Sequence, residues 1–350
     1  MFSAYTRIGD NRYRERYGLD FEDFAPGQIF RHRPGITLSQ QDNVDDALDT
    51  LNGAQVHYDA HYAAQTTWKN PLMVSTITLQ RLIGMSAKTF GKRRTISGFQ
   101  EISMTGPVFG GDTLYSESTI AEVAPGPDPD CGAVSVVTRG IKPDGKIVAK
   151  IVWRVVVGRR GRHPEDRATP NLVRATEPRF ASHRDTGDGA FVEQCGQFFE
   201  DCTAGDTFIH YPRKTFLRDE AIEHNYRSLD LTPMGHDLQW VEEHQGGRYC
   251  IPETFVVSAV TALTTRSFGR VVANLGWVDT VLPNPVYPGD TVEAESNIVE
   301  KRESRSRPNE GILTVDTRAR NQRGELVVSY RRNLLVYRRD AQTPYAAAGY

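Results

Sequence analysis

The sequence predicts an α+β protein made of two fused copies of one domain, each an antiparallel sheet wrapped around a long central helix. The duplication is visible in two pairs of blocks. "PVFGGDTLYSESTIAE" begins at Pro107 and "PVYPGDTVEAESNIVE" at Pro285, while "FEDFAPGQ" begins at Phe21 and "FEDCTAGD" at Phe199. Both pairs are 178 residues apart. One offset shared by two long blocks indicates a duplicated domain rather than a short structural repeat.

The elements of the first copy follow from its hydrophobic periodicity. A short strand is expected near Gln28–Arg33, before a polar helical stretch for which Ser39 is a suitable N-cap, with acidic residues after it. The apolar stretch Val74–Phe90 has helical spacing and is the expected central helix. The segments after it alternate between polar and apolar residues, which predicts strands. These segments are 95–105, 112–123, 132–141 and 146–160.

The duplication and the composition between the copies predict the domain organisation. We expect a first domain at residues 1–160 and a second at 191–350. Residues 161–190 between them are rich in charged residues, proline and glycine. This composition is typical of a linker that crosses the protein surface.

Composition excludes several classes of function. The net charge is -2, which argues against non-specific nucleic-acid binding because such binding depends on many phosphate contacts. Four cysteines without a CxxC pair argue against a disulfide framework and a cysteine zinc site. We expect neither a secretory signal nor a membrane span, because no apolar run approaches the roughly 20 residues that a span requires. A cytoplasmic protein is expected.

The stretch "TLNGAQVHYDAHYA", Thr50 to Ala63, holds the polar residues of greatest interest. His57 and His61 are four residues apart and would share a helix face, as do the zinc ligands of the HExxH motif. The glutamate of that motif is missing between them, and no third ligand is evident nearby. We therefore predict no metal, and we interpret His61 as a surface or interface histidine.

The order of elements resembles a hot-dog fold, and two fused copies resemble the double hot-dog MaoC-like dehydratases, also called hydratase 2. The motif of that family is D-x-N-P-x-H-x-D. This chain agrees with it at His57, at Asp59 and at Pro71, which stands fourteen residues after the histidine as in the family. It departs from the motif at Asn52, which replaces the first aspartate, and at Ala54–Gln55, which replace Asn-Pro.

Longer blocks are similar to a narrower branch, the mesaconyl-CoA hydratases, also called β-methylmalyl-CoA dehydratases. These blocks are "LNGAQVHYDAHYAAQT", "NPLMVST", "VVANLGWVDTVLP" and "EKRESRSRP". That branch also carries an asparagine before the histidine. The resemblance implies a hydro-lyase that reversibly hydrates mesaconyl-CoA to β-methylmalyl-CoA, with a CoA thioester as substrate and no further cofactor.

The resemblance also implies roles for individual residues. His57 would act as the base on water, since the pKa of histidine lies near neutrality. Asn52 would position the water through its carboxamide, unless it only caps a turn. Asp59 would orient His57 or, equally, cap a helix. The oxyanion donor would be the backbone amide of Val74 or Ser75 at the start of the central helix, with ordinary capping as the alternative.

Three further expectations stay open. In the second copy His236 follows Asp230 by six residues, one more than separates Asn52 from His57; we expect this copy to shape the acyl pocket, and the alternative is that it holds the working site. A substrate carboxylate would need a cationic partner, for which Arg81, Arg93 and Arg94, which flank the first central helix, are candidates. The basic segment 301–307 would bind CoA phosphates or form a solvated hairpin edge.

Several other functions fit the same fold. They are an (R)-specific enoyl-CoA hydratase for simple acyl chains, a hot-dog acyl-CoA thioesterase and a non-catalytic acyl-CoA binder. A homo-oligomer, a dimer or larger, is expected in each case, because hot-dog copies leave sheet edges that need cover.

Overall fold

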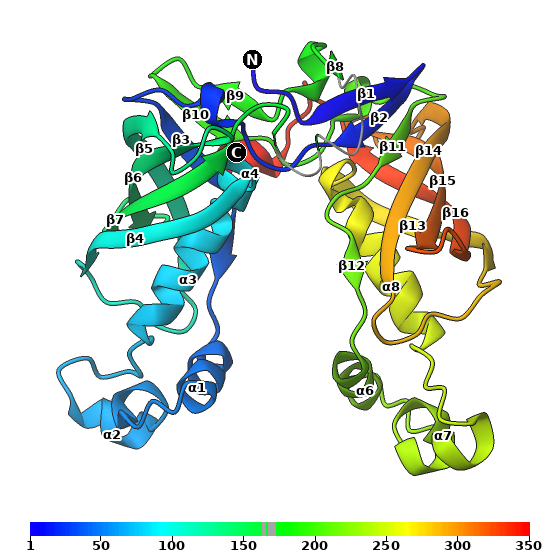
Figure 1. Cartoon of the computed structure of the whole chain (residues 1–350), viewed down its shortest axis with the longest axis horizontal. Helices are drawn as coiled ribbons and strands as arrows, with labels where there is room; N and C mark the ends of the chain where they lie inside the picture. Colours follow the sequence, from blue (N-terminus) through cyan, green and yellow to red (C-terminus); the bar gives the residue numbers. More distant parts are fainter. Residues whose placement is uncertain (163–165, 167–172) are drawn as a thin grey trace.

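The structure, a computed structural model, describes residues 1–162, 166 and 173–350. It confirms the predicted fold class. Each sequence copy forms a lobe in which an antiparallel sheet wraps around a central helix, and the two lobes meet at one end and diverge at the other (Figure 1). None of the helices in these described ranges is both long and apolar enough to cross a membrane.

The first lobe contains most of the elements predicted for the first copy. Its helices are α1 (Gln40–Asp49), α2 (Ala60–Gln65), α3 (Ser75–Met85) and α4 (Ala87–Phe90). Its strands are β3 (Ile29–Thr37), β4 (Arg93–Met104), β5 (Thr113–Pro125), β6 (Cys131–Ile141) and β7 (Ile147–Gly158). In the sheet they are ordered β4-β7-β6-β5-β3, followed by β10 (Ala190–Glu193) and β9 (His183–Asp185).

The second lobe repeats this arrangement. Its helices are α6 (Arg218–Arg227), α7 (Leu238–Gln245) and α8 (Glu253–Leu263), and α9 (Pro344–Ala347) follows its last strand. Its strands are β11 (Thr207–Ile209), β12 (Lys214–Thr215), β13 (Val271–Val281), β14 (Thr291–Glu303), β15 (Glu310–Asn321) and β16 (Leu326–Tyr337). The sheet order is β13-β16-β15-β14-β11, followed by β2 (Arg12–Glu15), β1 (Tyr5–Gly9) and β8 (Val173–Arg174).

The predicted central helix is interrupted near its C-terminal end. The apolar spacing predicted one helix over 74–90, but the chain forms α3 and α4, which meet at Ser86. The Ser86 hydroxyl donates to the Ile83 carbonyl at 2.7 Å. A serine side chain that bonds the backbone in this way competes with the helical hydrogen-bond pattern, which accounts for the break.

The central helix of the first lobe supplies one side of the core. Leu82 and Phe90 are fully buried and pack with Val134, Val136 and Trp153 of the sheet. The indole N–H of Trp153 donates to the Thr138 hydroxyl at 2.9 Å, so the largest buried side chain leaves no donor unpaired. Burying this apolar face drives the sheet to curl around the helix.

The two lobes exchange their first hairpins. The β1–β2 hairpin of the N-terminal segment joins the sheet of the second lobe, where β2 runs parallel to β11. The β9–β10 hairpin joins the sheet of the first lobe, where β10 runs parallel to β3. Residues 5–15 and 183–193 correspond under the 178-residue offset, so each copy gives its hairpin to the other. The described part of the predicted linker therefore carries β8 and β9.

Each exchanged hairpin is anchored by a buried carboxylate. A Glu193 oxygen lies 3.0 Å from His32 Nδ1 and accepts from the Thr89 hydroxyl at 2.7 Å. The duplicate carboxylate, Glu15, lies 3.0 Å from His210 Nδ1 and accepts from the Ser267 hydroxyl at 2.6 Å. Burial acts to raise the pKa of Glu193, but the charge and hydrogen bond of His32 outweigh it and hold that pKa at about 2.

We predict that Glu193→Gln lowers the free energy of unfolding at pH 7 by roughly 3 kcal/mol, since it breaks one partner of a buried pair. The folded pKa of Glu193 lies below its ordinary 4.5, so its stabilisation is complete above pH 4.5 and is lost as the pH falls toward 2. The variant should lack this acid-dependent component. Urea unfolding across this pH range measures both effects, and equal acid lability in both proteins would contradict the assignment.

The matched control is Glu122→Gln, a glutamate exposed on β5. It should change the free energy of unfolding by less than about 0.5 kcal/mol at any of these pH values.

Candidate active site

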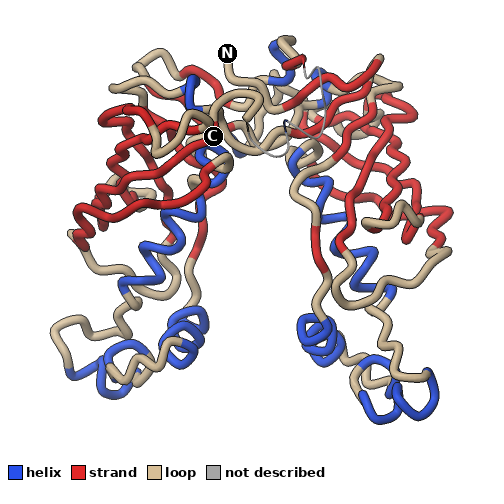
Figure 2. Tube along the Cα trace, in the orientation of Figure 1, coloured by secondary structure: helices blue, strands red, loops and turns tan. Residues whose placement is uncertain are grey.

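The motif stretch lies at the end of the first lobe that is remote from the junction of the lobes. There α1, a short 3₁₀ turn at Gln55–His57 and α2 stand beyond the N-terminal end of α3 (Figure 1). Ser39 caps α1 as predicted, because its side chain accepts from the Asp42 amide. Figure 2 shows that loops join these short helices to each other and to the central helix.

The ring of His57 is oriented by a single backbone carbonyl. Its Nδ1 lies 2.7 Å from the Leu72 carbonyl oxygen, so Nδ1 carries the proton and donates it. In the neutral ring Nε2 is then the unprotonated nitrogen, which is the form a general base requires. The side chain is half-buried, and no hydrogen-bond partner for Nε2 is found among the residues that the structure describes.

Asn43 is a buried residue that the motif did not point to. Its Nδ2 donates to the backbone carbonyls of His57 at 2.7 Å and of Leu72 at 3.1 Å, and its Oδ1 accepts from the Val74 amide at 2.8 Å. One carboxamide thus fastens the histidine turn to the start of α3. The only sequence feature that could have pointed to this role is that Asn43 is a polar residue on the buried face of α1.

The two predicted oxyanion amides differ in the structure. The Val74 amide already donates to Asn43, so its proton is engaged. The Ser75 amide is the first of α3, the residue is exposed, and no acceptor for this amide is found within the described ranges. The side chain that precedes the helix makes no capping bond. A free amide at a helix N-terminus is an anion-binding group, so Ser75 and not Val74 is the available donor.

Asn52 and Asp59 each accept a hydrogen bond from a nearby backbone amide. Asn52 is half-buried, and its Oδ1 accepts from the Ala54 amide at 3.1 Å, which forms a turn. Asp59 is exposed at the N-cap of α2 and accepts from the Tyr62 amide at 2.9 Å. Among the described contacts, no hydrogen bond joins either side chain to His57.

Arg93 and Arg94 are not brought to His57. They begin β4, which follows the C-terminal end of α4, whereas His57 lies by the N-terminal end of α3. The 11 residues of α3 and the four of α4 separate these ends, which corresponds to roughly 20 Å. Arg94 pairs with Asp128 at 2.8 Å. These arginines follow the central helix in sequence, and they therefore lie near its C-terminal end and away from His57.

The second lobe lacks the features that orient His57. The Nδ1 of His236 is buried and has no partner among the described residues. Asp230 accepts from the Thr232 amide and hydroxyl, at 3.2 and 2.7 Å, instead of bonding that ring. At the start of α8, Glu253 occupies the position of Ser75. A carboxylate in the first helical turn repels an anion, so this lobe is a poorer oxyanion site.

The basic segment 301–307 lies at the end of β14 and in the loop that follows it. Lys301 donates to the Cys202 carbonyl at 2.9 Å, a contact within the second lobe. This contact fits the solvated hairpin edge better than a phosphate site. No group of three or more His, Cys, Asp or Glu side chains suited to a metal ion occurs in the described part of the chain.

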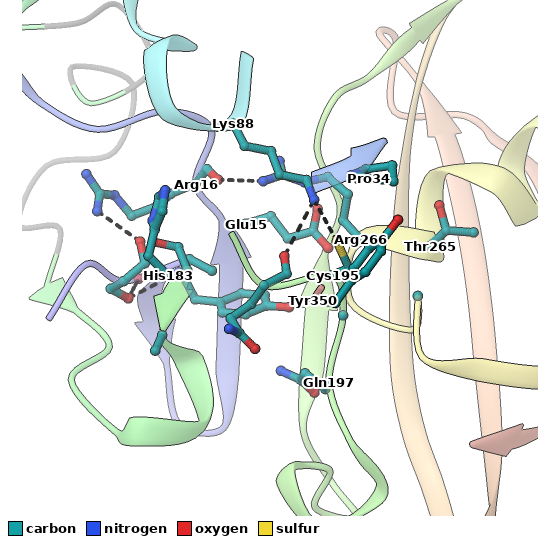
Figure 3. Close-up of a pocket in the computed structure, with 18 of the residues that line it drawn as sticks. Glu15, Arg16, Pro34, Lys88, His183, Cys195, Gln197, Thr265, Arg266 and Tyr350 are labelled. Carbon is teal, nitrogen blue, oxygen red and sulfur yellow. Dashed lines mark hydrogen bonds between the residues drawn. The ribbon is translucent and has the colours of Figure 1, made fainter. Parts of the chain in front are cut away.

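A cavity of about 550 Å³ lies where the lobes meet (Figure 3). Residues of both lobes line it, including Glu15, Lys88, Cys195 and Arg266. None of the residues predicted for the catalytic site is among its lining residues. The cavity and the His57 site are therefore separate features of the molecule.

Comparison with known proteins identifies the relatives of this chain. A family model described as mesaconyl-CoA hydratase matches residues 3–167 and 176–349. The mesaconyl-CoA hydratase of Cereibacter sphaeroides is 34% identical over 160 residues, which cover 43% of this chain and 44% of that protein. The β-methylmalyl-CoA dehydratase of Chloroflexus aurantiacus is 25% identical over 150 residues, 43% of this chain and 42% of that protein. The chain thus aligns with less than half the length of these relatives.

Solved structures with similar folds include two that span most of the chain. A MaoC domain dehydratase from Chloroflexus aurantiacus is 18% identical, with 92% of this chain and 98% of that one covered and a TM-score of 0.40. A Mycobacterium tuberculosis protein with a double hotdog fold is 20% identical, with 91% and 99% covered and a TM-score of 0.37. The family match over nearly the whole sequence decides the assignment: the chain belongs to the mesaconyl-CoA hydratase family.

Proposed function

We propose that the chain reversibly hydrates an enoyl-CoA thioester, and that its substrate is mesaconyl-CoA, converted to β-methylmalyl-CoA. The observation that carries the proposal is the His57 ring, held at Nδ1 by the Leu72 carbonyl with Nε2 left without a partner among the described residues, beside a helix start with a free Ser75 amide. Membership of the family and the printed names of the two relatives above support the substrate.

The proposed reaction uses His57 as both base and acid. Its Nε2 takes a proton from water while the water oxygen adds to the β-carbon of the thioester. Negative charge then develops on the thioester oxygen, where the Ser75 amide and the positive end of the α3 dipole stabilise it. The protonated imidazole returns a proton to the α-carbon, so water is added across the double bond. Asn52 is proposed to position the water and Asp59 to support the turn.

Asn43 is proposed to position the catalytic groups. It bonds the carbonyl of His57 and the amide of Val74 at the same time, so it fixes the histidine relative to the Ser75 amide. Because Asn43 is fully buried, its hydrogen bonds are shielded from water, and losing them would loosen the site.

For the free carboxylate of a mesaconyl group we propose Arg81 instead of Arg93 or Arg94. Arg81 lies on α3, six residues after Ser75, which corresponds to about 9 Å along the axis. It is half-buried, it reaches Asp42 at 3.5 Å, and its Nε has no partner among the described residues. A guanidinium with an unused donor suits a substrate carboxylate.

We predict that the protein removes the absorbance of the conjugated thioester of mesaconyl-CoA without releasing free thiol. His57→Ala should lower this rate by at least about 10²-fold, since general acid–base catalysis contributes that much or more. His236→Ala is the matched control in the second lobe and should retain the rate. An active His57→Ala variant would remove this residue from the mechanism.

The same assay separates the competing functions. Thiol release would favour a thioesterase, and a preference for crotonyl-CoA would favour a hydratase of simple acyl chains. Absence of any change with either thioester would favour a non-catalytic binder.

We propose a homo-oligomer in which the free edges of the two sheets pair with those of a second copy. The strands β4 and β13 end the two sheets, so each leaves unpaired backbone groups along one side. Exposed apolar side chains gather on these strands, and they are Phe99, Ile102 and Met104 on β4 and Leu275, Trp277, Val278 and Val281 on β13. A second copy supplies the complementary strand for each edge, and two-fold symmetry closes the assembly.

We predict that the protein has at least twice the 39.2 kDa chain mass in solution. Trp277→Lys should shift the mass to that of one chain, because it sets a charge on the pairing strand. Val299→Lys, which changes an exposed apolar residue on β14, is the control and should leave the mass unchanged. Light scattering coupled to size-exclusion chromatography measures all three, and a wild-type protein of single-chain mass would refute the arrangement.

A cytoplasmic setting is proposed from the cysteines. All four are free thiols in the structure, and Cys131 and Cys202 are buried. Free thiols are typical of proteins that work in a reducing compartment.

A further inference from the structure

The cavity between the lobes has the size of a ligand site. Its volume of about 550 Å³ falls within the roughly 300–1,000 Å³ that small-molecule sites occupy. Its apolar lining comes from both sequence copies and from the C-terminal segment, and it includes Leu19, Pro34, Ala181 and Tyr345. Nothing in the proposed hydration reaction uses this cavity.

Two cations in the cavity wall are bonded only to neutral groups. Lys88 donates to the Arg33 carbonyl at 2.9 Å and lies 3.4 Å from the Cys195 sulfur. Arg266, its duplicate under the 178-residue offset, donates to the Arg16 carbonyl at 3.2 Å. Neither forms an ion pair within 4.0 Å among the described residues, although the charge of Lys88 acts on Glu193 and that of Arg266 acts on Glu15. Figure 3 shows Lys88, Cys195 and Arg266 close together among the lining residues.

The other charged groups of the wall are already paired or neutral. Arg16 pairs with Asp20 at 3.0 Å, and Arg179 pairs with Asp206. Glu15 is the one acidic side chain among the described lining residues, and its oxygens accept from the Tyr211 amide and the Ser267 hydroxyl as well as facing His210. The wall therefore presents two cations whose hydrogen bonds go to neutral groups, while the hydrogen bonds of Glu15 go to other partners.

Gln197 is independent evidence that the cavity wall holds a hydrogen-bond donor without an acceptor. Its side chain lines the cavity and is 4% exposed, and its Nε2 has no acceptor among the described residues. A buried donor without an acceptor costs about 1–3 kcal/mol. A ligand oxygen in the cavity would remove this cost.

We propose that the cavity between the lobes binds a small aliphatic carboxylate. The carboxylate is held by Lys88 and Arg266 with the Gln197 amide as a further donor, and the aliphatic body packs against the apolar wall. This is a second binding site, distinct from the site at His57, and the proposal does not depend on the hydration activity.

The test is calorimetric titration of the intact protein at pH 7 with octanoate and, as the matched uncharged probe, octan-1-ol. Octanoate should bind saturably with one equivalent per chain, and octan-1-ol at least about tenfold more weakly because it lacks the charge. Lys88→Met and Gln197→Leu should each weaken octanoate binding about tenfold or more. His57→Ala should leave it unchanged, which separates this site from the candidate active site.

Circular dichroism and thermal unfolding establish that each variant is folded. Gln197→Leu keeps the volume of the side chain and removes a donor that bonds nothing in the protein, so it decides the question even where Lys88→Met does not fold. The proposal is overturned by the absence of saturable octanoate binding up to about 10 mM. Equal affinity for octan-1-ol, unchanged affinity in folded Gln197→Leu, or loss of binding in His57→Ala would overturn it as well.

Discussion

Two buried pairs of carboxylate and imidazole, Glu193 with His32 and Glu15 with His210, hold the two lobes together. Each pair joins the end of a hairpin from one sequence copy to the first strand of the other copy's sheet. Because both ends of each pair are desolvated, the attraction is strong and its geometry is demanding. The junction in turn fixes where the cavity lies and how far the two central helices diverge.

The duplication has kept this framework and changed the chemistry. The anchoring groups recur at the same offset, including Thr89 and Ser267, which both donate to the buried carboxylates. The copies differ at the starts of the central helices, since the residue that corresponds to Ser75 in the second copy is Glu253. Only one helix start therefore suits an anion. A duplicated protein can retain its packing in both halves while one half alone keeps a site.

The sequence was sufficient to predict the features that depend on local hydrophobic periodicity. Alternation along β5, β6 and β7 and the repeated blocks predicted the sheets and the duplication, because one buried face imposes its period on the chain. It was insufficient where distant segments meet. In the sequence Asn43 is one polar residue of α1, and its bonds to His57, Leu72 and Val74 form only once the turn at His57 and the start of α3 converge. The hairpin exchange also leaves no mark in the sequence, since the sheet of either copy could accept either hairpin.

The exchanged hairpins also bear on how such a chain could have arisen. In an ancestor with one copy per polypeptide, the same hairpin would have to reach across to a neighbouring molecule, as in domain swapping. Fusion of two genes would then convert an intermolecular exchange into an intramolecular one and raise its effective concentration. Each half of the present chain would lack its own hairpin anchor when separated, so the two halves are expected to be inherited, lost and recombined as a unit.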